Sequence, residues 1–160
     1  MVTPTLTPLA LALGRIPTGL YIVTTDDGGR ALGFVGSFVM QVGFVPPVVC
    51  VAIGKDRAHL AAVRASRHFA VCVLDKASEN LMPRFFKKPA PGKSAFDELP
   101  HHRASAGSPV LDGALAWMEC KFTGEHETGD HVVVFGEVVD GKLVREGEPS
   151  IHLRKSGLTY

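Results

Sequence analysis

The chain has 160 residues, of which 46% are hydrophobic and 21% charged, and its formal net charge is +1. This length and composition predict one globular domain over residues 1–160 with a substantial core, and they exclude a disordered chain. The small net charge argues against a nucleic-acid-binding surface, which would normally be basic.

The cysteines and the N-terminal residues bear on the cellular compartment. Cys50, Cys72 and Cys120 each lie in an apolar stretch and have no CxxC partner. Such thiols are typical of core residues in a reducing cytoplasm rather than of a disulfide framework. No basic region precedes the apolar stretch Leu9–Leu13, so no signal peptide is predicted. We therefore expect a cytoplasmic protein.

The first predicted element is a short helix. Thr7 and Pro8 are typical of a helix start, because threonine caps helix N-termini and proline fits the first turn, and the helix should end near Gly14. β-branched and aromatic residues then predict a strand over Gly19–Thr25, and Asp26–Gly29 predicts a hairpin turn.

An uncharged run follows over Ala31–Gly54. It has the length of a membrane span, but its glycines and Pro46-Pro47 would leave backbone groups unsatisfied in lipid, so no membrane segment is expected. We expect two buried strands, the second at Val48–Ile53, joined by an irregular segment over Ser37–Pro47. The run has only two polar side chains, those of Ser37 and Gln41, and it would suit a flat heteroaromatic ligand bound mainly by backbone groups. The alternative is that both side chains are satisfied core polar groups.

The middle of the chain combines a helix, a strand and a long loop. Lys55–Arg57 precedes a predicted helix, and His68–Leu74 predicts a strand. Lys76–Leu99 is proline-rich and irregular, with about one helical turn expected, and loops of this length are often functional. Its basic residues, like Arg154-Lys155 near the C-terminus, have solvated surface charge as their plainest interpretation; those in the loop are Arg84, Lys87, Lys88 and Lys93.

The last part of the chain is rich in strand-forming residues. Strands are predicted at Ala114–Glu127, His131–Val138 and Ile151–Leu153, and turns at Gly129-Asp130 and Asp140-Gly141. Six or so antiparallel strands with two minor helices predict a mainly β barrel. The histidines lack Cys, Asp or Glu partners at zinc-ligand spacing, so no metal site is expected.

Four motifs, taken in order, resemble the flavin reductase-like family. They are Thr18-Gly19, Ser37–Pro47, Lys55-Asp-Arg57 and Gly129-Asp-His131. The closest resemblance is to the flavin reductase domain of flavodiiron proteins, and it covers nearly the whole chain. The segments that carry it are Lys55-Asp-Arg-Ala58, Phe86–Gly92, Gly107–Val110, Ala114–Cys120 and His152–Gly157. The resemblance implies an FMN-binding split β-barrel, antiparallel and Greek-key-like, with a few short helices.

The resemblance also implies which residues bind the flavin. Backbone groups of Ser37, Phe38 and Val39 would hydrogen-bond the isoalloxazine edge, with Gln41 nearby. Lys55, Asp56 and Arg57 would bind the FMN phosphate at the positive end of the following helix, unless they form only an exposed turn. Lys87 and Lys88 are candidates for the same phosphate or for that of a dinucleotide.

The Gly129-Asp130-His131 turn would lie on the nicotinamide side of the pocket. An imidazole can hydrogen-bond an amide or phosphate and offers a face for stacking, although a surface role is the alternative for His131. Hydride transfer between cofactors needs no acid–base residue of the protein, so no catalytic residue is expected. Relatives commonly have hydroxyl or amide side chains where this chain has Val35, Met40 and Gly43, which leaves the choice between FMN and FAD open.

The sequence thus predicts a homodimer, since a small barrel with this much apolar surface would otherwise expose a large patch. The expected activity is hydride transfer from NAD(P)H to N5 of FMN, with FAD as the alternative flavin. The rival hypothesis is a non-catalytic FMN-binding or electron-carrier module without productive NAD(P)H docking.

Overall fold

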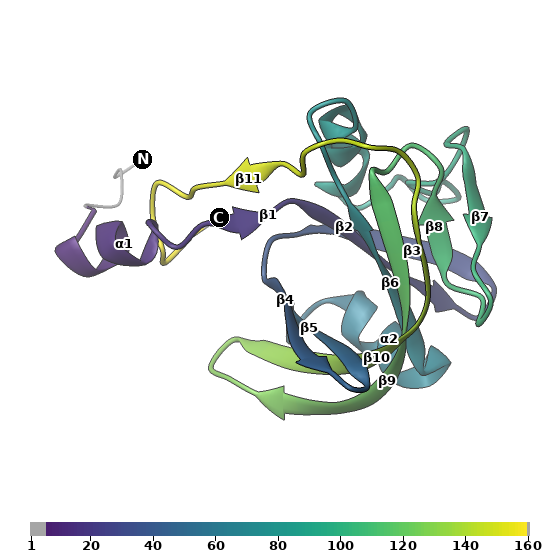
Figure 1. Ribbon diagram of the computed structural model, residues 1–160, viewed down its shortest axis with the longest axis horizontal. Coiled ribbons are helices and arrows are strands. Elements are labelled where there is room, and N and C mark those ends of the chain that lie inside the picture. The colour runs from purple at the N-terminus through teal and green to yellow at the C-terminus, as the bar shows by residue number, and fades with distance from the viewer. Residues whose placement is uncertain (1–5, 160) are drawn as a thin grey trace.

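A curved seven-stranded antiparallel sheet forms the body of the protein in a computed structural model that describes residues 6–159 (Figure 1). Its strand order is β3-β2-β6-β9-β10-β5-β4. The bounds of these strands are β2 Tyr21–Asp27, β3 Arg30–Gly36, β4 Val39–Phe44, β5 Pro47–Gly54, β6 His68–Val73, β9 Ala116–Glu127 and β10 His131–Leu143.

The two ends of this sheet are consecutive in the chain. β3 and β4 are the outermost strands of the order, yet only Ser37 and Phe38 separate them. The chain therefore crosses from one edge of the curved sheet to the other at these two residues. The expected fold class, a mainly β split barrel with a few short helices, is confirmed.

Two hydrophobic clusters hold the barrel together. The first lies within the curved sheet, where Phe69, Val51 and Val134 are fully buried and the helix α2 (Ala58–Ser66) contributes Leu60 and Val63. The second lies between the sheet and the segment that follows β6. That segment contains the 3-10 helix η1 (Glu79–Phe85) and a hairpin of β7 (His101–Arg103) and β8 (Pro109–Leu111). Burial of these large side chains is the main stabilising contribution to such a fold.

An arm projects from the barrel and carries both ends of the described chain (Figure 1). It contains α1 (Pro8–Leu13) and a two-stranded ribbon of β1 (Thr18–Gly19) with β11 (Ile151–His152). The predicted cap is confirmed, because the Ala10 amide donates to Thr7 Oγ1 at 3.1 Å. The C-terminal segment packs closely on α1, since a Cβ at Gly157 would lie 2.0 Å from that of Leu13.

The uncharged run differs from its prediction in one respect. Two strands were expected with an irregular segment between them, but most of that segment forms the regular strand β4. β4 is an edge strand whose residues are largely exposed, and its pairing with β5 shifts register between Gln41 and Gly43. Glycine and the proline pair disfavour a strand by local propensity, so β4 was not predicted from the sequence. No helix within residues 6–159 is long and apolar enough to cross a membrane.

The second half holds two further corrections. Asp140-Gly141 is not a turn: β10 continues to Leu143 and has a bulge between Val138 and Asp140, where the Asp140 side chain accepts a hydrogen bond from the Gly141 amide. The β7–β8 hairpin was not predicted, because its strands are three residues long and lack a strong apolar alternation.

Candidate functional site

A largely apolar cavity of about 400 Å³ opens beside the crossing between the two sheet edges. One part of its lining is the segment Gly36–Phe38, and another is Ala52 and Gly54 of β5. Phe85 and Phe86 at the end of η1 add aromatic surface, and the other lining residues are Leu20, Phe34, Val35, Arg57, Met82 and His152. Gly36, Ala52 and Gly54 have little or no side chain, so a flat ring can approach the main chain closely at these positions.

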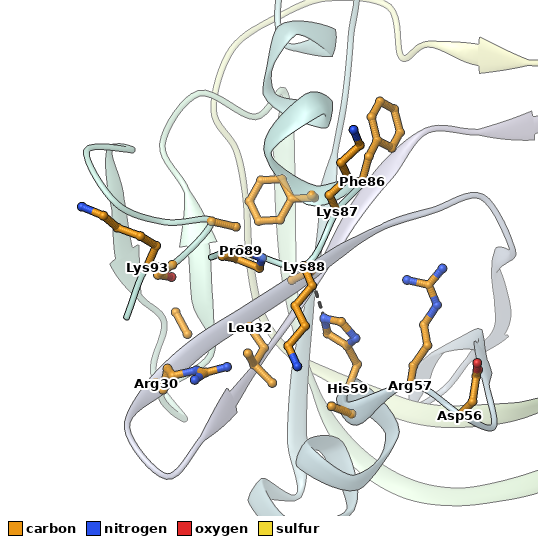
Figure 2. A pocket seen from close by; sticks show the side chains of 16 residues that line it. Arg30, Leu32, Asp56, Arg57, His59, Phe86, Lys87, Lys88, Pro89 and Lys93 are labelled. Carbon is orange, nitrogen blue, oxygen red and sulfur yellow. Dashed lines mark hydrogen bonds between the residues drawn. The ribbon is translucent and has the colours of Figure 1, made fainter. Parts of the chain in front are cut away.

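A basic cavity of about 360 Å³ adjoins the apolar one (Figure 2). The two share Arg57, Phe85 and Phe86. The cations that line the basic cavity are Arg30, Arg57, Lys87, Lys88 and Lys93. In Figure 2, Lys88 extends toward the side on which His59 lies, whereas Lys87 points away beside Phe86. This arrangement provides positive charge next to an apolar slot.

Arg57 stands at the boundary between these two cavities. It is the N-cap residue of α2, and its guanidinium lies 5.7 Å from the centre of the Phe34 ring. The Arg57 side chain forms no capping hydrogen bond to this helix, and the first helical residues, Ala58 and His59, also line the basic cavity. The N-terminal amides and the dipole of α2 therefore add to the positive potential, while Asp56 contributes one carboxylate.

His59 is a site residue that the sequence analysis missed. Its Nε2 lies 3.0 Å from the Gly33 carbonyl oxygen, the contact dashed in Figure 2, and its buried Nδ1 has no hydrogen-bond partner in the part of the chain that the structure describes. Burial lowers the pKa of His59 and outweighs the opposing effect of the Gly33 carbonyl. A neutral ring that donates from Nε2 has an acceptor at Nδ1, which fits a hydroxyl donor of a ligand. Its place two residues after Arg57, in the first turn of the helix, was the only available signal.

The predicted Gly129-Asp130-His131 turn lies against the end of β5. His131 pairs with Gly54 across the β5–β10 ladder, and the Lys55 amide donates to the Asp130 carbonyl at 3.0 Å. His131 Nδ1 donates to Asp130 Oδ1 at 2.8 Å, and this bond lowers the pKa of Asp130. The His131 ring meets Phe38 edge-on with 5.8 Å between centroids. A third cavity, of about 430 Å³, lies here and shares Phe38 and Ala52 with the apolar one.

The structure thus gathers most of the predicted site residues around three adjoining cavities. Ser37 and Phe38 line the apolar cavity, Asp56, Arg57, Lys87 and Lys88 the basic one, and His131 the third. Val39 lines an apolar groove that shares Ser37, Phe38 and Ala52 with the apolar cavity.

Two predicted residues line neither the three cavities nor the groove. Lys55 forms an ion pair with Glu127 at 2.9 Å and lines none of them. Gln41 is exposed on β4, and its side-chain amide donates to the Gly43 carbonyl at 3.0 Å. For both residues, flavin binding stays a prediction.

The cysteines are placed much as predicted. Cys72 and Cys120 are buried in the core, and burial raises the pKa of each thiol to about 12. A thiol with such a pKa is protonated at neutral pH and is a poor nucleophile. Cys50 differs, since it is only half-buried and lines the apolar groove next to Val39. Within residues 6–159, no three His, Cys, Asp or Glu side chains cluster closely enough to hold a metal ion.

Comparison with known proteins adds an independent line of evidence. Residues 13–158 match the family model described as "Flavin reductase like domain". Diflavin flavoprotein A 1 of Synechocystis sp. (strain ATCC 27184 / PCC 6803 / Kazusa) is 36% identical over 154 residues, which are 95% of this chain but only 27% of that relative. The chain therefore spans about a quarter of the length of this curated relative.

Solved structures of other proteins have the same fold as this chain. NADH:FAD oxidoreductase SgcE6 of Streptomyces globisporus C-1027 is 29% identical with a TM-score of 0.82, and the match covers 91% of this chain and 86% of that one. A nitrilotriacetate monooxygenase component B homologue from Mycobacterium thermoresistibile is 30% identical with a TM-score of 0.81, covering 91% of this chain and 80% of that one. Such matches support flavin-dependent oxidoreductase chemistry for the domain. The chain belongs to the family of flavin reductase like domains.

Proposed function

We propose that this domain binds FMN and catalyses hydride transfer from NAD(P)H to the flavin. The observation that carries the proposal is the pairing of an apolar cavity with a basic one through Arg57. FMN has the same polarity, because a flat neutral ring is linked by a short polar chain to a phosphate. The name of the relative SgcE6 includes FAD, so FAD is the flavin to compare directly with FMN.

The ring would occupy the apolar cavity. Backbone groups of Gly36–Phe38 offer hydrogen bonds to its polar edge, while Ala52 and Phe85 provide apolar contact. Ser37 is 8% exposed and contributes a small side chain that leaves the wall open. The lack of charge on this part of the wall fits a neutral heteroaromatic system.

The phosphate would occupy the basic cavity. Arg57 and Lys88 supply charge-assisted donors, and the start of α2 supplies amide groups and a positive dipole end. The unpartnered Nδ1 of His59 can accept a hydrogen bond from a hydroxyl of the linking chain. This donor set matches the chemistry of a phosphorylated ribityl chain, so the residues fit the cofactor.

NAD(P)H would dock in the third cavity, beside Phe38 and His131. The shared residues Phe38 and Ala52 put this cavity next to the proposed ring site, so the role of these residues is to orient the nicotinamide and exclude water. When bound, the flavin would supply the redox chemistry, namely hydride acceptance at N5 from C4 of the nicotinamide and onward transfer of two electrons to free flavin, a protein acceptor, iron or oxygen.

The proposal includes a homodimer in the cytoplasm. An apolar groove of about 630 Å³ runs along the arm and β4, and large hydrophobic side chains near it are exposed, including Ile151 at 74% and Met40 at 61%. Surfaces of this kind on small proteins are usually covered by a partner, and a second copy would cover both arms symmetrically. Sedimentation velocity on the purified protein distinguishes this dimer from a monomer.

Binding and turnover measured together test the proposal. Apoprotein should bind FMN with quenching or enhancement of flavin fluorescence, and with excess FMN it should oxidise NADH or NADPH catalytically. The rival function, an FMN-binding electron carrier, predicts the same binding without turnover by either nucleotide. A protein that binds neither FMN nor FAD rules out both functions.

A further inference from the structure

The third cavity contains an arginine that the proposed hydride transfer has not yet used. Besides Phe38 and Ala52, its lining includes Asp130 and His131 at the start of β10 and Arg154 in the segment after β11. From the sequence alone, only a solvated surface charge was expected at Arg154. The backbone of Arg154 is held by a hydrogen bond, because Arg15 Nη2 donates to its carbonyl oxygen at 3.2 Å.

The guanidinium of Arg154 contacts an aromatic ring and forms no ion pair with any residue in the described range 6–159. Its central carbon lies 4.7 Å from the centroid of the Phe38 ring, and its buried Nε has no hydrogen-bond partner among residues 6–159. The carboxylate in the cavity lining, Asp130, is 91% exposed and already accepts a hydrogen bond from His131.

An unpaired guanidinium in a cavity selects for a particular kind of ligand. Its planar set of N–H donors matches the oxygen atoms of a phosphate, and a stack on an aromatic ring keeps those donors directed sideways. A buried donor without an acceptor is unfavourable, so an oxyanion that reaches it is favoured. Phe38 and Ala52 line both this cavity and the apolar cavity.

We infer that Arg154 binds a phosphate group of the nicotinamide dinucleotide and so positions the hydride donor over Phe38 and Ala52. The inference rests on the proposed function, since it places the donor in the third cavity. Two phosphates have the required chemistry: the pyrophosphate, which NADH and NADPH share, and the 2′-phosphate, which only NADPH carries. Arg154 is thus a substrate-binding residue and takes no part in the proton or hydride movement.

Arg154→Met tests this with little change in packing, because methionine keeps an unbranched apolar side chain against Phe38. Arg154→Lys retains the positive charge but lacks the planar guanidinium with its paired N–H donors. Lys155→Met is the matched control, because it removes an exposed neighbouring charge. Binding of NAD⁺ and NADP⁺ to flavin-loaded protein is measured by calorimetry, and turnover by steady-state kinetics. For Arg154→Met we expect affinity to fall and KM to rise by about tenfold or more, with kcat within about twofold.

The pattern across nucleotides identifies the phosphate. Equal losses for NAD⁺ and NADP⁺ assign the pyrophosphate, and a loss confined to NADP⁺ assigns the 2′-phosphate. Arg154→Lys should recover part of the affinity, and Lys155→Met should bind like the parent protein. Added salt should weaken binding to the parent more than to Arg154→Met.

Three results would overturn the inference. One is unchanged binding of both nucleotides by flavin-loaded Arg154→Met. A second is loss of flavin affinity together with nucleotide affinity in both Arg154 variants, which would make Arg154 a structural support of the ring wall. The third is a salt dependence of nucleotide binding in the parent protein that is no steeper than that of a neutral ligand, a result that needs no variant to fold. Failure of the proposed function looks different, since the parent itself would then bind FMN but not respond to either nucleotide.

Discussion

Gly54 and His131 are direct partners across the β5–β10 ladder. This register brings the Gly129-Asp130-His131 turn to the end of β5, where Lys55–Arg57 leads into α2. Two motifs more than seventy positions apart in the sequence therefore flank one strand end. One side carries the basic cavity, and the other carries the cavity with His131 and Arg154.

Arg57 should account for a large part of flavin affinity. Arg57→Ala removes the cation that borders both cavities, and we expect the Kd for FMN to rise by about 10- to 100-fold, the usual effect of losing a charge-assisted hydrogen bond. Fluorescence titration of apoprotein measures it. Arg64→Ala is the control, because Arg64 lies on the same helix and pairs with Glu125 at the surface. Equal affinities for both variants would contradict the phosphate assignment.

Ala52 should be intolerant of a larger side chain for reasons of binding rather than folding. It lines the apolar cavity, the third cavity and the groove along the arm. Ala52→Leu adds three carbon atoms to the proposed ring wall, so we expect FMN binding to weaken by about 100-fold or more while the melting temperature changes little. Ala65→Leu on the exposed side of α2 controls for added hydrophobicity. If Ala52→Leu binds FMN normally, the ring lies elsewhere.

The buried carboxylate of Glu119 should make stability fall in acid. Glu119 is fully buried, and its oxygens accept hydrogen bonds from the amides of Ala106 at 2.7 Å and Ser108 at 2.8 Å. Burial raises the pKa of Glu119, but these bonds outweigh it and the net pKa is lowered. A lowered folded-state pKa gives stability that is present above the unfolded value, roughly pH 4, and is lost as pH falls through the folded value.

Glu119→Gln tests that carboxylate. The variant should lose about 2 kcal/mol of unfolding free energy at neutral pH, because charged hydrogen bonds are lost and one amide-facing oxygen becomes a donor. The difference from the parent protein should shrink below roughly pH 4 in urea unfolding experiments. A difference that stays constant from neutral to acid pH would show that the charge of Glu119 does not contribute.

Gly136 should be required by packing within the barrel. A Cβ there would lie 2.6 Å from that of Cys120 and 2.7 Å from the Phe69 ring. Gly136→Ala should therefore lower the unfolding free energy by about 1–3 kcal/mol, as overpacking in a core does. Gly124→Ala on the neighbouring strand is the control, because nothing lies within 4 Å of a Cβ there, and it should change stability by at most about 0.5 kcal/mol. Chemical denaturation of both variants decides the matter.

The sequence predicted those parts that depend on local pattern. Runs of β-branched residues located β2, β5 and β6, and the opening at Lys55–Arg57 located both α2 and one candidate phosphate residue. β4 was not predicted, because its pairing with β5 is interrupted at Gly43, near Pro46-Pro47. In β4, sheet pairing overrides a weak local propensity for strand.

The missed site residues depend on contacts between distant parts of the chain. His59 is oriented by the carbonyl of Gly33 in β3, and Arg154 is stacked on Phe38 from beyond β11. Neither contact leaves a periodic signal, since each involves one side chain and a tertiary neighbour. Lys55 shows the converse, because its place in the motif suggested a phosphate ligand while its side chain pairs with Glu127.

Anaerobic reduction of the flavin-loaded protein is the most direct test of the proposed hydride transfer. The protein is loaded with FMN, mixed with NADH or NADPH in the absence of oxygen, and followed by the visible absorbance of oxidised flavin. Our account predicts rapid loss of that absorbance with at least one of the two nucleotides. Absorbance that stays unchanged with both, in protein whose flavin is bleached by a chemical reductant, would contradict it.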